Sequence, residues 1–212
     1  MAPAMPHTPS TAPVARRHRH LHRIAWLAVA LALCVIVFGA FVRLSNAGLS
    51  CPDWLTCYGR AGWPAQAQDA AGHAANAISP VEPHQAWREQ VHRHAAAILG
   101  LLVLAMALLT ARHRRHGIAQ VIAGASLVAL SIPLYMQGHP LVALAVAGAG
   151  QAVLLVAALR WSNVDLSRAA ALTLMVIVFQ ALLGKWTVTL LLKPLVVMGH
   201  LMGGLLTLSL LV

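Results

Sequence analysis

Long apolar runs alternate with short basic or polar segments along the whole chain. These runs cover residues 24–42, 88–111, 118–136, 141–159, 169–190 and 195–212. The first run contains nineteen residues and no charge, and as a helix it spans roughly 28 Å, close to the thickness of a bilayer's hydrocarbon core. The pattern therefore predicts an all-α, polytopic transmembrane helical bundle of about six helices.

The segments between the runs predict the remaining organisation. Residues 1–23 are rich in Pro, Ala, His and Arg without apolar periodicity, which predicts a disordered basic tail. Residues 44–87 form the one long hydrophilic stretch and are expected to be an extramembrane loop. The short segment 137–140 predicts a tight turn, so that 117–165 is a helical hairpin within the bundle of residues 24–212.

Composition and charge support a membrane location. Hydrophobic residues make up 59% of the chain and charged residues only 9%, which is too little polar surface for a soluble globule. The net charge of +10 comes from fifteen Lys/Arg against five Asp/Glu, and basic clusters at 16–23, 112–116 and 160–168 alternate with loops that lack such clusters. The positive-inside rule then predicts a multi-pass protein of the bacterial inner membrane with a cytoplasmic N-terminus and loop 44–87 outside. Clusters at helix ends form no groove-sized patch, so we expect no nucleic-acid partner.

The last apolar run still continues at Val212, with no basic or polar flank after it. The expectation from the sequence is a fragment, or a chain whose missing flank a partner supplies.

Glu89 and His92 lie at the outer mouth of the second predicted helix. They are three residues apart and so share a helix face, and the same face continues through Ala96, Leu99 and Gly100, which would let a flat macrocycle approach. The alternative is structural: Glu89 pairs with Arg93 one turn away, and His92 is a hydrated interfacial histidine.

A second histidine, His200, is the only titratable residue of the last apolar run. Gly203 and Gly204 follow three and four positions later and would clear space on its face. Topology places His92 and His200 at the same side of the membrane and at similar depth. Two histidines on facing helices are a common way to hold haem iron from both axial positions.

An arginine and two cysteines complete the candidate residues. Arg43 stands at the outer end of the first run, as either a snorkelling interfacial side chain or a partner for a haem propionate. Cys51 and Cys57 lie in the outer loop, where a structural disulfide and a more easily reduced, exposed redox pair both remain open. Cys34 lies within the first run and is interpreted as a small apolar residue.

Several ordered segments resemble heme A synthases. Residues 42–54, VRLSNAGLSCPDW, resemble the outer-loop signature of that family, and residues 89–93, EQVHR, are similar to its E-x-x-H-R motif. The stretch FQALLGKWTVT at 179–189, followed by 192–194 and 200–201, resembles the third and fourth helices of the family.

The resemblance implies an oxidoreductase of heme A biosynthesis, needed for assembly of cytochrome oxidase. Such an enzyme oxidises a methyl group of heme O to the formyl group of heme A, through successive hydroxylations, in a bundle of four plus four helices. It implies that His92 and His200 are the axial ligands of the substrate haem, that Glu89 is catalytic, and that Cys51 and Cys57 match the loop cysteines. The haem b cofactor of the C-terminal half has no ligands in this chain.

The implied partners are the lipid bilayer, heme O and its synthase, an electron donor of unknown identity, and a second copy of the chain. Two rival functions use the same histidines: a bis-histidine b-type cytochrome for electron transfer, and a non-catalytic haem-binding assembly protein. Two features depart from the family pattern, namely the hairpin 117–165 and Lys185, which stands in an apolar helix and either needs a partner there or lies near the membrane interface.

Overall fold

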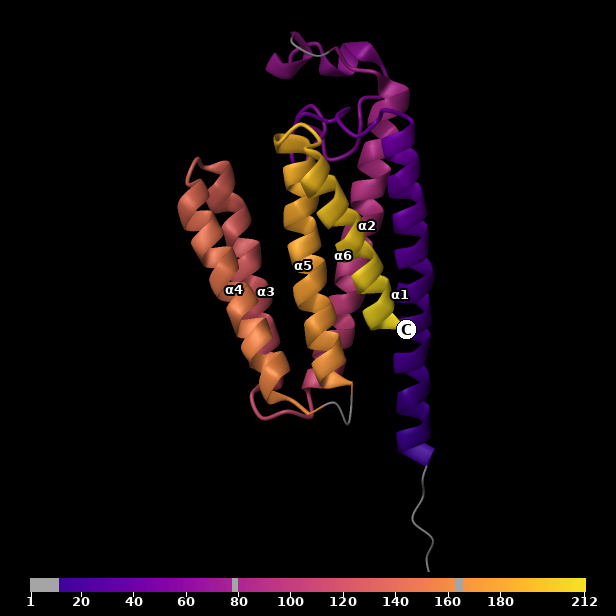
Figure 1. Cartoon of the computed structure of the whole chain (residues 1–212), viewed down its shortest axis with the longest axis vertical. Helices are drawn as coiled ribbons and strands as arrows, with labels where there is room; N and C mark the ends of the chain where they lie inside the picture. Colours follow the sequence, from indigo (N-terminus) through magenta and orange to yellow (C-terminus); the bar gives the residue numbers. More distant parts are fainter. Residues whose placement is uncertain (1–11, 78–79, 163–165) are drawn as a thin grey trace, which may run out of the picture.

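The computed structural model describes residues 12–77, 80–162 and 166–212. Six long helices make up most of these residues, and two short 3₁₀ helices lie in the loop after the first (Figure 1). The bounds are α1 Ala12–Leu44, η1 Ala67–Ala70, η2 Ala74–Ala77, α2 Pro83–Ala111, α3 Gly117–Met136, α4 Pro140–Arg160, α5 Ser167–Thr189 and α6 Pro194–Leu211. In the described part of the chain, the extended pairing is limited to a single bridge between Cys57 and Arg60.

All six helices are long and apolar enough to cross a membrane. The predicted all-α fold with about six spans is therefore confirmed. Many large apolar side chains on the helices are exposed, among them Trp26, Leu101 and Leu195. Apolar surface on this scale is unfavourable in water and is the surface that a bilayer covers.

Three helices begin at a proline, because proline's fixed φ suits the first helical position and its missing N–H costs nothing there. These prolines are Pro83, Pro140 and Pro194. As a result α2 begins five residues before the predicted apolar run. α1 also begins earlier than predicted, at Ala12, so that the basic cluster at 16–23 continues the first helix; residues 1–11 lie outside the described part.

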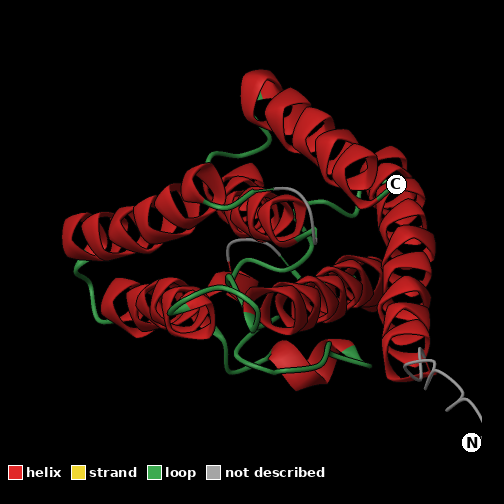
Figure 2. Cartoon of the chain, turned by 90° about the horizontal axis from the view of Figure 1, so that it is seen from below, coloured by secondary structure: helices red, strands yellow, loops and turns green. Residues whose placement is uncertain are grey.

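Four helices form a closed ring in which α1 packs on α2, α2 on α5, α5 on α6, and α6 on α1 (Figures 1 and 2). Consequently α2 and α6 face each other across one diagonal, and α1 and α5 across the other. The core of the ring is rich in alanine and small side chains, including Ala28, Ala32 and Ala107. Small residues let membrane helices approach closely, which is how helices associate in lipid.

The predicted hairpin is formed by α3 and α4, which pack on each other beside the ring (Figure 1). Their closest approach is at Gly124 and Gly150: a Cβ on Gly150 would lie only 2.7 Å from the carbonyl oxygen of Gly124. The hairpin contacts the ring through α4 on α5 and α3 on α2. The turn at 137–140 is present, with Gly138 at φ 85°.

The two ends of the bundle differ in chemistry. One end, here called the loop end, carries residues 45–82 and the starts of α2, α4 and α6 (Figure 1). At the opposite end, Arg114 donates to the carbonyl and hydroxyl of Ser162 and to the Ser167 hydroxyl, at 2.6, 2.9 and 2.9 Å. This arginine therefore ties the α2–α3 link to the α4–α5 link.

Candidate functional site

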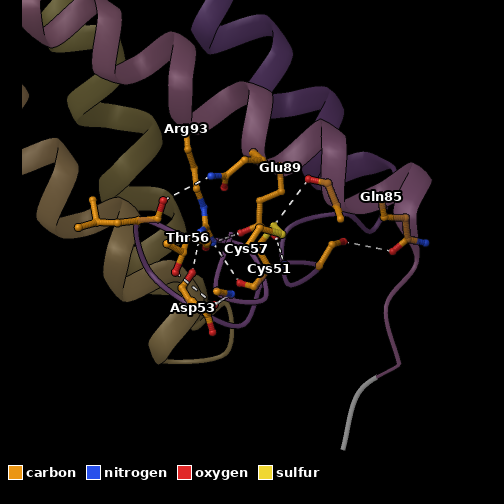
Figure 3. The surroundings of a disulfide bond; sticks show 12 residues. Cys51, Asp53, Thr56, Cys57, Gln85, Glu89 and Arg93 are labelled. Carbon is orange, nitrogen blue, oxygen red and sulfur yellow. Dashed lines mark hydrogen bonds and ion pairs between the residues drawn. A yellow bond between two sulfur atoms is a disulfide. The ribbon is translucent and has the colours of Figure 1, made fainter. Parts of the chain in front are cut away.

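The loop at the loop end is organised around the guanidinium of Arg93 on α2. Its Nη1 donates to the carbonyls of Asp53 and Thr56 at 2.6 and 3.1 Å, and its Nη2 donates to the Cys51 carbonyl at 3.1 Å (Figure 3). These three carbonyls belong to residues 51–56, which thus bend around one cation. Carbonyls that converge on a half-buried guanidinium are satisfied by it instead of by water.

Glu89 completes this arrangement from one helical turn before Arg93. Its carboxylate forms an ion pair with Arg93 and accepts the backbone N–H of Cys51 at 2.8 Å (Figure 3). Glu89 is only 4% exposed. The pairing of Glu89 with Arg93, which was the structural alternative for this residue, is therefore present. Any catalytic role of Glu89 must be compatible with these two contacts.

Cys51 and Cys57 are joined by a disulfide. Both residues are fully buried, and the Cys51 sulfur lies 3.6 Å from the carbonyl of Ala86 on α2. The pair is therefore not exposed, as the redox alternative supposed, and its burial agrees with a structural disulfide. The reason is that the loop folds back onto the first turn of α2, where Tyr58 and Val81 cover the cysteines.

Gln90 is a loop-binding residue that the sequence reasoning missed. It is fully buried, and its Nε2 donates to the carbonyls of Ala61 and Leu55 at 2.9 and 3.4 Å. With Glu89 and Arg93 it forms a polar cluster on α2 whose partners lie in the loop or within the cluster itself. The signal was a run of long polar residues at the start of an apolar helix.

Asp69 holds the second half of the loop. Its carboxylate accepts the N–H groups of Ala65 and Gln66 at 2.9 and 3.1 Å, and it lies 3.3 Å from Arg60. The hydrogen bond from Gln66 is the largest influence, and together with Ala65 and Arg60 it lowers the pKa of Asp69 from its ordinary value of 3.8.

His92 and His200 come from the facing helices α2 and α6, as the sequence predicts. They lie close enough to interact electrostatically. In both imidazoles Nδ1 is buried and has no hydrogen-bond partner among the described residues. An unpaired polar atom in an apolar bundle is costly, so both rings retain an unused capacity for a ligand.

A glycine from the other diagonal of the ring faces each imidazole. A Cβ on Gly39 of α1 would lie 2.7 Å from Cε1 of His92, and a Cβ on Gly184 of α5 would lie 3.3 Å from Cε1 of His200. Because neither glycine has a side chain, the two imidazole rings can occupy the space beside α1 and α5.

The glycines predicted to clear the face of His200 serve other contacts. A Cβ at Gly203 would overlap the amide of Gln180, and one at Gly204 would lie 3.6 Å from Ile36. The sequence reasoning looked for space on the histidine's own helix, whereas the space lies on the neighbouring helices.

The donor set of this site fits a haem iron. No group of three or more His, Cys, Asp or Glu able to hold a metal ion occurs within residues 12–77, 80–162 and 166–212. A zinc site with protein ligands requires three or four of them, whereas a porphyrin supplies the equatorial nitrogens itself and needs only axial ligands. Two imidazoles with buried, unpaired nitrogens match that requirement.

Two arginines lie near the α1 end of this site. The side chain of Arg43 is exposed and makes no hydrogen bond or ion pair with the residues described. Arg88 of α2 lies over the ring of Phe41 at 5.2 Å, and its Nε is buried without a hydrogen-bond partner. Arg88 is thus a second candidate for an anionic group, which the sequence reasoning had not considered.

Lys185, the unexpected charge in α5, is only 9% exposed. Its Nζ lies 3.1 Å from the ring centre of Tyr135 at the end of α3 and 5.8 Å from that of Trp54 in the loop. The partners that the lysine requires are therefore two aromatic rings, through cation–π contacts.

Comparison with known proteins identifies relatives of the chain. The family model described as cytochrome oxidase assembly protein matches residues 22–139. The heme A synthase of Shewanella oneidensis is 32% identical over 194 residues, which are 89% of this chain and 44% of that protein. The heme A synthase of Geobacillus kaustophilus is 33% identical over 82 residues, or 39% of this chain and 20% of that protein. No solved structure matches significantly.

These matches confirm the resemblance stated from the motifs. The chain spans less than half the length of the curated relatives that it matches.

Proposed function

Because the chain belongs to the cytochrome oxidase assembly protein family, we propose that its bundle holds the substrate haem of a heme A synthase between His92 and His200. The observation that carries this proposal is the pair of facing imidazoles, each with a buried, unpaired Nδ1 and each against a glycine of a neighbouring helix. In the folded chain these nitrogens have no hydrogen-bond partner among the described residues. Axial ligation of a haem iron would give both imidazoles a binding partner and fix the orientation of both rings.

The proposed reaction is the oxidation of a methyl group of heme O to the formyl group of heme A, by successive hydroxylations at that carbon. An unactivated C–H bond requires an oxidant that amino-acid side chains do not provide and that haem chemistry supplies. The contribution of the chain is to bind and orient the substrate and to exclude water. Haem b as a cofactor belongs, in this proposal, to a second half like that of the longer relatives.

Glu89 is the proposed catalytic residue, with the task of accepting or moving a proton beside the substrate. Its position three residues before His92 supports this role, because the two side chains share one face of α2. Arg93 and the N–H of Cys51 fix the direction of the carboxylate. Conversion to heme A should be lost in Glu89→Gln while haem binding persists, and unchanged conversion would refute the role.

Arg43 and Arg88 are proposed to bind the haem propionates at the loop end. The buried, unpaired Nε of Arg88 supports this proposal most directly. Arg88→Gln should then weaken haem binding more than Arg43→Gln, because only Arg88 is partly desolvated. Equal affinities in both variants and the parent protein would exclude a propionate role.

The proposed setting is the bacterial inner membrane, with the N-terminus cytoplasmic and the loop end outside, since the basic clusters gather at the opposite end. Proposed partners are the heme O synthase, as the source of substrate, an electron donor, and a second copy of the chain. Labelling of a single introduced cysteine in loop 45–82 by a membrane-impermeant reagent tests this orientation.

The central experiment compares the purified protein with His92→Ala, His200→Ala and His94→Ala after co-expression with a supply of heme O. His94 is the matched control, because it lies on the same helix but is exposed. We expect a low-spin haem spectrum that both site variants lose and the control keeps, with heme O or heme A in the extract. Haem b retained in all four proteins would refute the axial pair. A haem that both site variants lose, but whose porphyrin methyl stays unaltered in the parent protein, would favour the cytochrome function instead.

A further inference from the structure

A groove separate from the imidazole pair lies between the hairpin and the ring. It has a volume of about 500 Å³ and is formed by α4, α5 and α6, with α5 in the middle (Figure 1). Its lining includes Gly148 and Gln151 of α4, Phe179 and Gln180 of α5, and Gly199 and Gly203 of α6. The volume is that of a small-molecule site, and the lining is apolar apart from the two glutamines.

Two glutamines line this groove, and each has one buried side-chain atom without a hydrogen-bond partner among the described residues. Gln180 is 8% exposed, and its Nε2 is buried with no hydrogen-bond partner. Gln151 donates its Nε2 to the carbonyl of Met175 at 3.2 Å, which leaves its buried Oε1 unpaired. In an apolar membrane region both groups carry a desolvation cost that a suitable ligand would relieve.

The groove begins beside His200. The amide of Gln180 lies against Gly203, one turn along α6 from His200, and Gly184, one turn along α5 from Gln180, faces the His200 imidazole. A flat ring held by His200 therefore has its edge near Gln180. A substituent on that edge would pass the two amides before it enters the apolar part of the groove.

We propose that this groove binds the prenyl chain of the substrate haem, with Gln180 and Gln151 holding the hydroxyl next to the ring. Heme O carries a hydroxyl on the carbon attached to the porphyrin, followed by a long farnesyl chain. One hydroxyl can accept a hydrogen bond from Nε2 of Gln180 and donate one to Oε1 of Gln151. A phospholipid acyl chain has neither group and would leave both amides unpaired.

This inference rests on the proposed axial pair and adds substrate selection to it. Haem b carries only a short vinyl group at the same ring position, so it gains nothing from the groove. The groove thereby distinguishes heme O from haem b, although both offer the same iron to His92 and His200.

The test is an optical titration of the purified protein in lipid nanodiscs with heme O and, separately, with haem b. Gln180→Met and Gln151→Met remove the polar groups at nearly constant size. Gly148→Leu fills the groove, because a Cβ there meets nothing within 4 Å. Ala149→Leu is the matched control, since the neighbouring residue is exposed and does not line the groove.

We expect the parent protein to bind heme O more tightly than haem b. Each glutamine variant should lower heme O affinity about two- to tenfold, as for one neutral hydrogen bond, and Gly148→Leu about tenfold or more. Haem b affinity should stay the same throughout, which also shows that each variant is folded. Ala149→Leu should bind both haems like the parent protein.

Two results would overturn the inference in different ways. Equal affinity for the two haems, or glutamine variants that lower the affinity for both haems alike, would show that the groove does not bind the substrate. Neither result would contradict the proposed axial pair. Binding of neither haem, or binding insensitive to His92→Ala and His200→Ala, would instead overturn the proposed function, and this inference with it. Should Gly148→Leu fail to fold, the double variant Gln151→Met with Gln180→Met decides the question.

Discussion

The loop anchor on α2 and the imidazole pair differ in how their polar atoms are paired, although His92 stands on the same helical turn as the anchor. In the loop anchor, formed by Glu89, Gln90 and Arg93, the charged groups have partners in the loop or in each other, while Oε1 of Gln90 is buried without a partner in the described part of the chain. In the imidazole pair, both rings leave a buried Nδ1 unpaired among the described residues. The contacts of the first region hold the loop, whereas the second region offers the nitrogens on which the proposed haem site rests.

The comparison separates structural from binding residues within one motif. Glu89, His92 and Arg93 lie within five positions of the sequence, and a motif alone gives them equal weight. The partners of each residue show that Arg93 and Glu89 hold the loop, whereas Nδ1 of His92 has no hydrogen-bond partner among the described residues. The division is supported if variants of the loop anchor lower the stability of the protein and variants of the imidazoles lower ligand binding.

The largest effect on stability is expected from Arg93→Ala. This change leaves the Glu89 carboxylate buried without its cation and three loop carbonyls without their donor, which should cost about 3–5 kcal/mol. Thermal unfolding in detergent measures it, with Arg88→Ala as the control because that guanidinium contacts only rings. Similar losses in both variants would contradict the special role of Arg93.

Loss of the disulfide should have the next largest effect. Cys51→Ser combined with Cys57→Ser releases a loop of sequence separation 6, for which chain entropy gives a loss of about 2 kcal/mol. The unfolding midpoint of this variant should equal that of the reduced parent protein. A variant as stable as the oxidised protein would mean that the Arg93 contacts alone hold the loop.

His92→Ala and His200→Ala should have little effect on the protein without haem, at most about 1 kcal/mol each. The reason is that neither Nδ1 has a partner to lose. Added haem should raise the unfolding midpoint of the parent protein, by ligand linkage, and leave those of the variants unchanged. A large loss of stability in the haem-free variants would show that the imidazoles are structural after all.

The smallest effect concerns acid and the second half of the loop. Since the folded pKa of Asp69 lies below its ordinary value, its contribution to stability is full above that value and disappears as the pH falls through the folded pKa. Asp69→Asn should therefore lower the unfolding midpoint slightly near neutral pH and flatten its decline in acid. An unchanged decline from neutral pH into acid would assign that pH dependence to other groups.

The helices, and the position of His92 and His200 at one end of the bundle, were predictable because they depend on hydropathy and topology. Apolar runs of membrane length fix where helices occur, and their alternation brings His92 and His200 to the same end. Cys51 and Cys57 were predictable as a pair because they share one short loop.

Contacts between helices were not predictable in the same way. Membrane helices are apolar on all sides, so the sequence does not reveal which face of α1 or α5 points inward. The places of Gly39 and Gly184 against the imidazoles depend on that rotation. The burial of the disulfide and the groove at Gln151 and Gln180 likewise depend on how separate elements are packed.

The cation–π contact of Lys185 with Tyr135 makes the hairpin part of the surroundings that a buried charge in α5 requires. Tyr135 lies in the last turn of α3, so without the hairpin the ammonium of Lys185 would keep only the more distant ring of Trp54. A charge that lacks partners in a membrane is costly. Removal of the hairpin should therefore cost more stability with lysine at position 185 than with an uncharged residue there.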